Sequence, residues 1–469
     1  MSYQSAQQPT KSRAVPRGRL WLGDVTHSQH HLSMTYGMDA LRFETSYWYG
    51  DVDLNELRER YGATAFERLL FHILAFEANK LISLGPATFD LGAFAHFHTE
   101  RFATLWKEVA RKVWAQWRYL NDLPDYHGPA IVGVPAAQDN SEPIEMEMGS
   151  PRLLCFCGGG KDSLVSLKLL ERAGFSYSTF TYSSSVYGNA EHQHQLVDGL
   201  LQHASAERHH RQWVYDSFID APVMRFFPDF GAGGILAAET PSSIFGALPL
   251  MLQHGYRYAV LAHEKSANKG NLIWDKTGED VNHQWGKSLE AEALLSDYIR
   301  SELVANIDYF SILQPLYDVG IFKLLNEDLA AVPDTHSCNV RKPWCCRCPK
   351  CAYVWVNYMA HLPEELVDSI FGLNLFDVEE NQLWFRQMLG LEEHTPFECI
   401  GQIPEARLAF ELCRRKGLAG RAMSTFIEEV PAVDVDEILA RYQVVDIAGS
   451  RIPAEIAEKV RDLMRPGAE

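Results

Sequence analysis

The spacing of hydrophobic residues changes along the chain and predicts different secondary structure in each region. Residues 20–49 alternate short apolar and polar runs and carry several aromatic side chains, which predicts a small β-sheet. Over residues 54–84 and 98–120 the apolar positions recur every three or four residues, which predicts long helical segments. After residue 150 short apolar runs alternate with helical patterns, and beyond residue 350 the pattern is mainly helical.

The middle part of the chain predicts a parallel sheet. Short apolar runs suitable for strands occur at 153–157, 178–182, 212–215, 258–263 and 309–313. Helical patterns follow these runs at 164–170, 191–203, 243–253 and 318–329. One further helical pattern ends at about residue 304. Strands that alternate with helices imply a parallel α/β sheet covered on both faces, with ligands at the carboxyl ends of its strands.

The first of these strands runs into a glycine turn that opens a helix. Glycines let the backbone approach a ligand closely, and the free N–H groups at a helix start attract an anion. The lysine supplies a cation, the aspartate a magnesium ligand, and the serine a hydroxyl that can cap the helix or bind phosphate. The turn consists of Gly158, Gly159, Gly160, Lys161, Asp162 and Ser163. It predicts a phosphate site, and the alternative is a glycine turn without a ligand.

Two polar stretches downstream are candidates for the rest of the site. The first leaves the strand candidate 258–263 and contains Glu264, Ser266, Asn268 and Asn271. We expect it to form the second wall of the site, with a plain surface loop as the alternative. The second contains His283 and Lys287, which would share a helical face if the helix has begun by then. A single histidine is more often structural, but this one lies among polar residues that a core helix would not tolerate.

Cysteines cluster near residue 345. Five of the nine fall between Cys338 and Cys351, which favours a metal site over disulfides in a reducing compartment. Four of them can form a closed tetrahedral zinc site, and an iron–sulfur cluster would need the same ligands. These four are Cys338, Cys345, Cys348 and Cys351. Cys346 interrupts their spacing and is predicted to be a bystander.

Composition limits the partners. The 469 residues include 46% hydrophobic and 12% aromatic residues, enough for a large core. A net charge of −18 argues against nucleic acid as a partner, since counterion release needs a basic surface. There is no run of 18 apolar residues and no apolar signal core within residues 1–19. We therefore expect a cytoplasmic protein with no membrane partner.

The glycine turn resembles a known signature. It is not the common P-loop, because Lys161 is followed by Asp162. It is similar to the Ser-Gly-Gly-x-Asp-Ser motif of the PP-loop pyrophosphatases, with Gly158 in place of the usual Ser. That resemblance implies a Rossmann-like sheet that binds ATP and releases pyrophosphate. The cysteine group also resembles the knuckle of the PP-loop 7-cyano-7-deazaguanine synthases.

Taken together, the motifs resemble one family over about residues 50–420: the ATP-dependent UDP-N-acetylmuramoyl-L-alanyl-L-glutamate epimerases of bacterial peptidoglycan synthesis. The strings that carry the resemblance are the turn 158–163, Glu264 to Asn271, Asn-His-Gln at 282–284 with Lys287 and Ser288, the cysteine motif, and Pro-Phe-Glu-Cys at 396–399. Cys346 stands where the family pattern has Gly.

The resemblance implies a reaction and its cofactors. ATP and Mg²⁺ would serve to adenylate the terminal carboxylate of the UDP-muramoyl dipeptide, the L-Glu α-carbon would be inverted to D-Glu, and AMP and pyrophosphate would be released. Zn²⁺ would be structural. Lys161 and the glycine N–H groups would hold phosphates, and Asp162 would help to hold magnesium. Ser266, Asn268 and Asn271 would contact ATP.

Proton transfer at the α-carbon needs a base and an acid. Glu264, His283 and Lys287 are the candidates, with Cys157 as an outsider. His283 has the most suitable intrinsic pKa, and Lys287 is expected to act as a charge clamp. The alternative role for Glu264 is to bind magnesium or ribose.

The expected organisation is a Rossmann-like (PP-loop) α/β protein with an α+β N-terminal domain and a four-cysteine zinc knuckle. The predicted parts are a mobile arm (1–17), a substrate domain (18–150, ending in a linker), an ATP-binding domain (151–335), a knuckle and helical region (336–420) and a helical tail (421–469). Two other classes stay open: a PP-loop ligase or amidating enzyme, and a zinc-stabilised nucleotide-binding regulator without turnover. An epimerase of another peptide is a further alternative.

Overall fold

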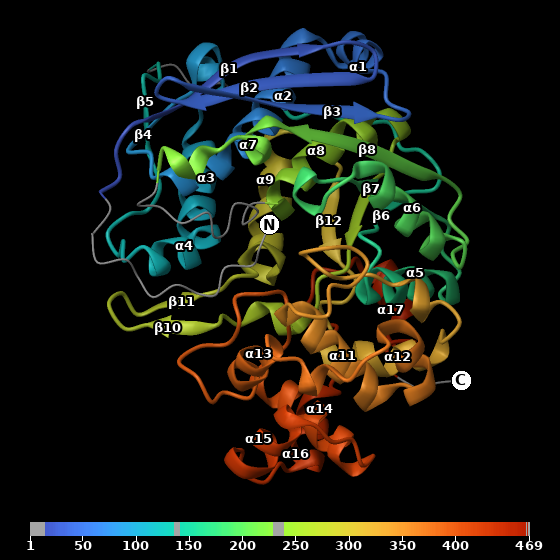
Figure 1. Cartoon of the computed structure of the whole chain (residues 1–469). Helices are drawn as coiled ribbons and strands as arrows, with labels where there is room; N and C mark the ends of the chain where they lie inside the picture. Colours follow the sequence, from blue (N-terminus) through green and yellow to red (C-terminus); the bar gives the residue numbers. More distant parts are fainter. Residues whose placement is uncertain (1–14, 136–140, 228–238, 466, 468–469) are drawn as a thin grey trace.

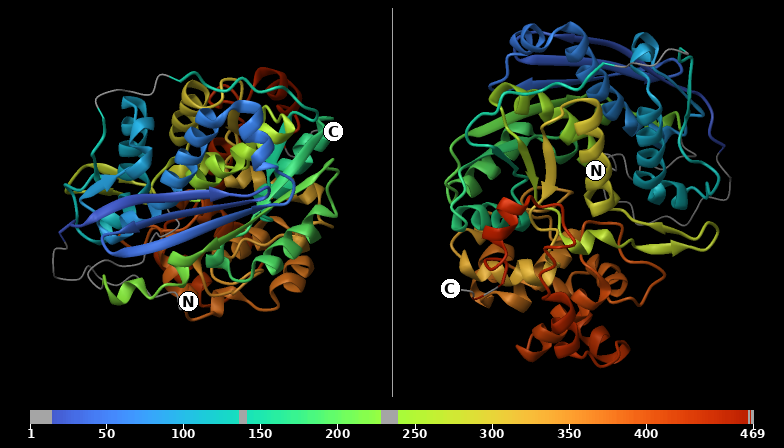
Figure 2. Two further views of the ribbon diagram at one scale, coloured as in Figure 1. Left: turned by 90° about the horizontal axis from the view of Figure 1, so that it is seen from above. Right: turned by 180° about the vertical axis from the view of Figure 1, so that it is seen from behind.

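One mixed sheet of ten strands runs through the part of the chain that the structure describes, from its centre to one end (Figure 1). The computed structural model describes residues 15–135, 141–227, 239–465 and 467. The strands are β1 (Arg19–His27), β2 (His31–Met38), β3 (Leu41–Tyr49), β4 (Thr88–Asp90), β5 (Ala130–Val132), β6 (Leu153–Phe156), β7 (Tyr177–Tyr182), β8 (His209–Asp216), β9 (Tyr258–Leu261) and β12 (Asp308–Ser311). Their order is β12-β9-β6-β7-β8-β3-β2-β1-β4-β5. A separate hairpin, β10 (Leu272–Trp274) and β11 (Glu279–Val281), projects to one side (Figure 2).

The predicted parallel α/β sheet is confirmed, since β12, β9, β6, β7 and β8 all pair in parallel. The predicted N-terminal sheet is confirmed as the antiparallel strands β1–β3. The two are continuous, because β3 pairs antiparallel with β8, with Tyr47 opposite Val214. The expected division of the chain at residue 150 stays a prediction, and the sheet itself crosses it.

The helices agree with the predicted spacing, with breaks that have local causes. They are α1 (Leu54–Tyr61), α2 (Ala63–Ala78), α3 (Glu100–Val113), α4 (Ala115–Leu120), α5 (Lys161–Arg172), α6 (Ala190–Leu201), α7 (Ser217–Asp220), α8 (Glu239–His254), α9 (Leu289–Glu302), α10 (Asp318–Leu324), α11 (Pro349–His361), α12 (Glu364–Phe371), α13 (Asn381–Met388), α14 (Ile403–Arg415), α15 (Arg421–Glu429), α16 (Val435–Tyr442) and α17 (Ala454–Val460). The predicted helix 54–84 breaks at Gly62, whose φ of 85° ends α1. The predicted helix 98–120 breaks at Trp114.

The parallel strands bury both faces, as their apolar runs require. Along β6, Leu154 and Phe156 join one hydrophobic cluster, whereas Leu153 and Cys155 join another. The first cluster extends through α2, α3, α8 and α9, and the second extends through α5, α10, α11 and α14. Helices α11–α16 gather at the end of the molecule opposite β1–β3 (Figures 1 and 2).

The predicted arm and linker lie outside this core. Most of the expected arm (residues 1–14) and part of the expected linker (136–140) lie outside the described residues. The remainder of the linker is tied to the body, since Ile144 forms a β-bridge with Val304. Among the described residues, no helix has the length and hydropathy needed to cross a bilayer.

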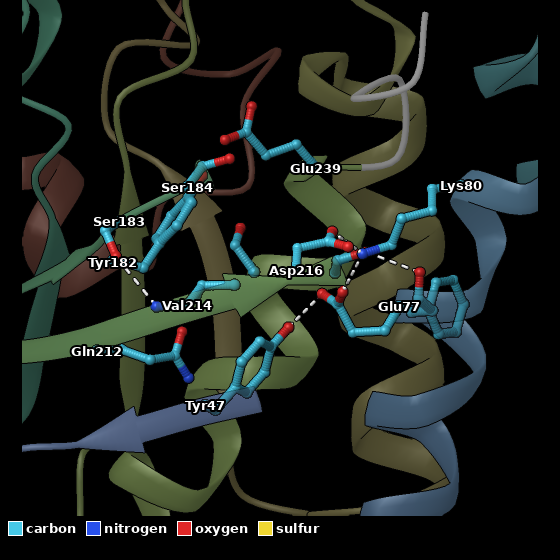
Figure 3. A pocket seen from close by; sticks show the side chains of 13 residues that line it. Tyr47, Glu77, Lys80, Tyr182, Ser183, Ser184, Gln212, Val214, Asp216 and Glu239 are labelled. Atoms are coloured by element: carbon cyan, nitrogen blue, oxygen red, sulfur yellow. Dashed lines mark hydrogen bonds and ion pairs between the residues drawn. The ribbon is translucent and has the colours of Figure 1, made fainter. Parts of the chain in front are cut away.

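A buried ion group joins the two halves of the sheet. Lys80, in the 3₁₀ helix Asn79–Leu84 that follows α2, pairs with Glu77 at 2.7 Å and with Asp216 at the end of β8. Tyr47 of β3 donates its hydroxyl hydrogen to Glu77 (Figure 3). Burial would lower the pKa of Lys80, but the Asp216 and Glu77 carboxylates raise it well above its usual value, so the ammonium stays charged. One cation therefore neutralises two carboxylates at the junction.

Replacing that cation should destabilise the junction. We expect Lys80→Met to lower the free energy of unfolding by about 3–5 kcal/mol, because it leaves two buried carboxylates without a counter-charge. Thermal or urea unfolding measures the loss. Arg60→Met is the matched control: it removes the exposed Arg60–Glu56 pair of α1, which should cost less than about 0.5 kcal/mol. Equal stability of the two variants would contradict the role assigned to Lys80.

Candidate active site

The carboxyl ends of four parallel strands converge on one crevice. From β6 the chain moves outward to β7 and β8, and then returns to place β9 and β12 on the other side of β6. The strand order therefore reverses between β6 and β9, which is where open α/β sheets bind ligands. Gly158 follows β6 and Glu264 follows β9, so both predicted walls lie at this point.

The glycine turn is shaped by its contacts with the segment that precedes the cysteines. Gly159 has a φ of 81°, and a Cβ at this position would overlap the His336 ring. Its carbonyl accepts a hydrogen bond from the His336 backbone N–H at 2.8 Å. The Gly158 N–H donates to the Ser163 hydroxyl at 3.1 Å, and a Cβ at Gly158 would meet no atom within 4 Å. The turn thus has one packed side and one open side.

Lys161 is buried and already paired with carboxylates. Its ammonium donates to Asp162 at 2.5 Å and to Asp318 at 2.6 Å. Asp318 is the first residue of α10, and it also accepts a hydrogen bond from the Tyr353 hydroxyl at 3.0 Å. The sequence pattern marks Asp318 only as the start of a helix, although it follows the β12 end of the sheet.

Glu264 adds a third carboxyl group to this crevice. Burial, together with Asp318 and Asp162, raises its pKa above the usual range. Glu264 thus has too little positive charge around it, whereas Lys161, Lys350 and Lys287 lower the pKa of Asp162 against the effect of burial. An array of oxygen ligands with excess negative charge suits a hard divalent cation such as Mg²⁺.

The residues predicted to contact ATP in the second wall are bonded to protein groups. Ser266 donates to Glu405 and accepts the Asp318 backbone N–H at 3.1 Å. Asn268 donates to Gln314 at 2.9 Å and accepts the Leu289 N–H at 2.7 Å. Their contact with ATP stays a prediction, and the described bonds give them a positioning role.

Asn271 connects the segment of His283 to the turn of Pro396. Its side-chain carbonyl accepts the His283 backbone N–H at 2.9 Å, and its amide donates to the Pro396 carbonyl at 2.8 Å. It therefore holds His283 beside the turn that contains Cys399.

His283 and Lys287 meet at one sulfur, by a different route from the one predicted. The helix α9 begins only at Leu289, so the condition for a shared helical face is not met. Instead, Lys287 donates to the Cys399 Sγ at 3.1 Å and the His283 imidazole hydrogen-bonds with the same sulfur. The other contact of the imidazole is from Nδ1 to the Gln116 side-chain oxygen at 2.6 Å.

These contacts shift the charge states. Burial would raise the pKa of Cys399, but the Lys287 charge and the His283 hydrogen bond lower it. Burial would lower the pKa of His283, but Cys399 raises it. Both shifts favour the charged forms, a thiolate at Cys399 and an imidazolium at His283. Sequence reasoning missed Cys399 as a functional candidate, although the residue belongs to the string Pro-Phe-Glu-Cys that carries part of the resemblance.

A pocket opens at the carboxyl end of β7 (Figure 3). Its wall includes Lys80, Ser183, Ser184 and Glu239. Glu239 is the first residue of α8 and accepts a hydrogen bond from the Tyr187 hydroxyl at 3.1 Å. Burial raises the pKa of Glu239, against the opposing charge of Lys287.

The four predicted metal cysteines come together. Their sulfurs lie within 4.8 Å of one another, with 3.8 Å between Cys338 and Cys348 and 3.9 Å between Cys345 and Cys351. Backbone N–H groups of Val340 and Arg341 point at the Cys338 sulfur. The cluster is arranged to hold a metal ion.

Comparison with known proteins assigns a family. The family model described as the MurL N-terminal domain matches residues 242–312, and the MurL C-terminal domain matches residues 334–436. A curated protein from a Micromonospora strain, named UDP-N-acetyl-alpha-D-muramoyl-L-alanyl-L-glutamate epimerase, is 30% identical over 325 residues, which are 67% of this chain and 68% of that protein. The chain belongs to the MurL family.

Two further relatives carry the same name. The protein from Salinispora tropica is 30% identical and the alignment covers 65% of this chain and 64% of the relative. The protein from Xanthomonas oryzae pv. oryzae is 29% identical over 65% of this chain and 66% of the relative. The chain thus spans about two thirds of the length of the curated relatives it matches. No solved structure matches the chain significantly.

The MurL matches contain much of the candidate site. The N-terminal match includes Glu264, His283 and Lys287, and the C-terminal match includes the cysteine cluster and Cys399. The glycine turn at 158–163 lies outside both.

Cys346 has a backbone conformation that favours glycine. Its φ is 62°, the left-handed region that a side chain disfavours, and its sulfur is not in the metal-binding group. Its carbonyl accepts a hydrogen bond from Asn381 at 3.0 Å, which keeps the backbone in this conformation.

Glycine should therefore suit this position better than alanine. We expect Cys346→Gly to exceed Cys346→Ala in free energy of unfolding by about 1 kcal/mol, because only glycine relieves the left-handed strain. The alanine variant is the control for loss of the thiol, and thermal unfolding measures the difference. An alanine variant at least as stable as the glycine variant would refute this account.

Proposed function

We propose that the chain is an ATP-dependent epimerase of UDP-N-acetylmuramoyl-L-alanyl-L-glutamate. It adenylates the terminal carboxylate, inverts the L-Glu α-carbon to D-Glu, and releases AMP and pyrophosphate. The observation that carries the proposal is the position of Lys287, which donates to the Cys399 sulfur and also acts by its charge on Asp162 of the glycine turn, in a chain whose MurL relatives bear this epimerase name.

Adenylation explains why one site needs both a turn that binds phosphate and a group that transfers a proton. The α-proton beside a carboxylate resists removal, because the carbanion would form next to an existing negative charge. The acyl adenylate lacks that charge, so a side-chain base can take the proton and the planar enolate can be reprotonated on its other face. A ligase or amidating enzyme would need the turn but no proton-transfer group.

The sheet supports ATP as the co-substrate. The order of the five parallel strands is compatible with the proposed Rossmann-like, PP-loop domain, with the glycine turn after its first strand. In the proposal, the open side of Gly158 and the N-terminus of α5 bind the phosphates. Lys161 supplies the buried positive charge and keeps Asp162 and Asp318 in place.

Asp162, Glu264 and Asp318 are the residues that would hold Mg²⁺. When bound, the ion supplies charge neutralisation between these carboxylates and the phosphates. The raised pKa of Glu264 supports this fit, because a second cation is what would favour its ionised form.

His283 is proposed as one of the proton-transfer groups. It is partly buried, held by Asn271 and Gln116, and hydrogen-bonded with Cys399. Lys287 acts as a charge clamp, since its pKa is raised by Cys399 and Glu264 despite burial. The pocket beside Glu239 would take the dipeptide end of the substrate. The cytoplasmic location expected from the sequence stays a prediction.

Zinc is the metal that best fits the cysteine cluster. A tetrahedral site with Zn–S bonds of about 2.3 Å separates its sulfurs by about 3.8 Å. The two measured separations, 3.8 Å and 3.9 Å, agree with this value. A cluster of several irons would hold its four sulfurs farther apart. With four thiolates the site is closed, so its role is structural.

The reaction is tested with ATP, Mg²⁺ and the UDP-muramoyl dipeptide in D₂O. We expect AMP, pyrophosphate and a D-glutamyl product that carries α-deuterium. Asp162→Asn should reduce substrate-dependent pyrophosphate release at least about 100-fold, since it removes a charged ligand next to the phosphates. Lys168→Ala is the control on the same helix, because Lys168 pairs with Glu171 away from the turn.

The products separate the competing classes. Formation of ADP would rule out cleavage between the α and β phosphates. Formation of AMP without α-deuterium would favour a ligase or amidating enzyme, and the absence of any ATP turnover would favour a regulator.

The metal assignment has its own test. Metal analysis should find about one zinc per chain, and Cys348→Ser should lose that zinc and much of the stability, because metal binding contributes folding free energy. Cys413→Ser is the matched control: Cys413 is buried in α14 and contacts only the Val356 carbonyl among its described polar partners. A Cys348→Ser protein that keeps zinc and stability would refute the assignment.

A further inference from the structure

The Cys399 sulfur has the features of a base. It is partly exposed, whereas Cys155 and Cys157 are buried in the sheet. It accepts a hydrogen bond from Lys287 at 3.1 Å and lies beside His283. Its backbone is fixed from both sides, because the Cys399 N–H donates to the Glu398 carboxylate at 2.7 Å and Lys350 donates to the Cys399 carbonyl.

A metal-binding role for this group is disfavoured. His283, Glu398 and Cys399 place their possible ligand atoms within 4.8 Å of one another. However, Lys287 already points its ammonium at the sulfur, and Glu398 is bonded to Asn339 at 2.8 Å. Two cations beside one sulfur make a thiolate available to a proton rather than to a metal ion.

We propose that Cys399 is the catalytic base that removes the α-proton, and that Glu239 is the acid that protonates the opposite face. This inference rests on the proposed epimerase function. Glu239 lies on the wall of the pocket at the carboxyl end of β7 (Figure 3). Cys399 lies on the C-terminal side of the crevice, and both groups interact with Lys287.

The step balances with these two groups. The Cys399 thiolate forms an S–H bond as the Cα–H bond breaks, and the electron pair enters the enolate of the acyl adenylate. The Glu239 carboxyl O–H then breaks as a new Cα–H bond forms on the other face. The Cys399 thiol then loses its proton to water, and Glu239 regains a proton from water, so both groups return to their starting states.

The charge states agree with these roles. Against the effect of burial, Lys287 and His283 lower the pKa of Cys399, which favours its thiolate form. Burial raises the pKa of Glu239, which favours its protonated form, although the Tyr187 hydrogen bond and the Lys287 charge oppose this shift. By contrast, burial raises the pKa of Cys157 to about 11, which makes that thiol a poor base.

Isotope exchange tests the pair. With ATP, Mg²⁺ and the UDP-muramoyl dipeptide in D₂O, Cys399→Ser should still release pyrophosphate but incorporate α-deuterium at least about 100-fold more slowly than wild type. Glu239→Gln should incorporate deuterium yet return mainly L-glutamyl product, because it lacks the acid for the other face. Cys413→Ser is the control and should behave as wild type.

The outcomes separate this inference from the function on which it rests. If the wild-type protein turns over and Cys399→Ser incorporates α-deuterium at the wild-type rate, Cys399 is not the base. If Glu239→Gln inverts normally, Glu239 is not the acid. If wild type gives neither pyrophosphate nor deuterium incorporation, the epimerase function fails and the inference fails with it.

The thiolate is measurable without turnover. The rate of Cys399 alkylation by iodoacetamide, followed by peptide mass spectrometry, should titrate below the range of an ordinary thiol. Lys287→Met should raise that midpoint, because it removes the cation nearest the sulfur. The charged and titratable groups that face Cys399 are Lys287, His283, Glu398, Tyr187 and Lys350. A midpoint that is ordinary in wild type and unchanged in Lys287→Met would overturn the assignment of a thiolate base.

Discussion

The candidate site depends on how few cations are buried among many carboxyl groups at the edge of the sheet. Lys161 is held between Asp162 and Asp318, and Glu264 shares the same crevice. Charges buried in a protein interior are stable only when they are paired and hydrogen-bonded. The local structure supplies these bonds from several elements, so the crevice keeps its shape while it retains an excess of negative charge that a bound cation can neutralise.

The C-terminal region completes this crevice from the other side. Lys350, next to Cys351 of the metal-binding cluster, donates to the Cys399 carbonyl, and Asn271 donates to the Pro396 carbonyl. The cysteine cluster and the second wall of the crevice therefore hold the same turn in place. The proposed metal site, although it would take no part in the reaction, would in this way help to determine where the sulfur of Cys399 lies.

Local sequence patterns predicted the parallel sheet, its covered faces, the turn after β6 and the cysteine group, because each arises from short-range spacing. The continuity of β3 with β8 could not be predicted, since pairing between strands so distant in sequence leaves no local signal. The same limit explains Asp318 and Cys399. Each is an ordinary residue in its own segment and becomes significant only beside Lys161 or Lys287.

Lys287 links the two halves of the proposed reaction through charge. Its pKa is raised by Cys399 first and by Glu264 and Asp162 in addition, against the effect of burial. The thiolate and the carboxylates thus share one ammonium. A cation bound by the carboxylates would reduce their hold on Lys287 and leave its charge to the sulfur. The half of the crevice that activates the substrate carboxylate would then also favour the ionised form of Cys399. That form is the one that can accept the α-proton.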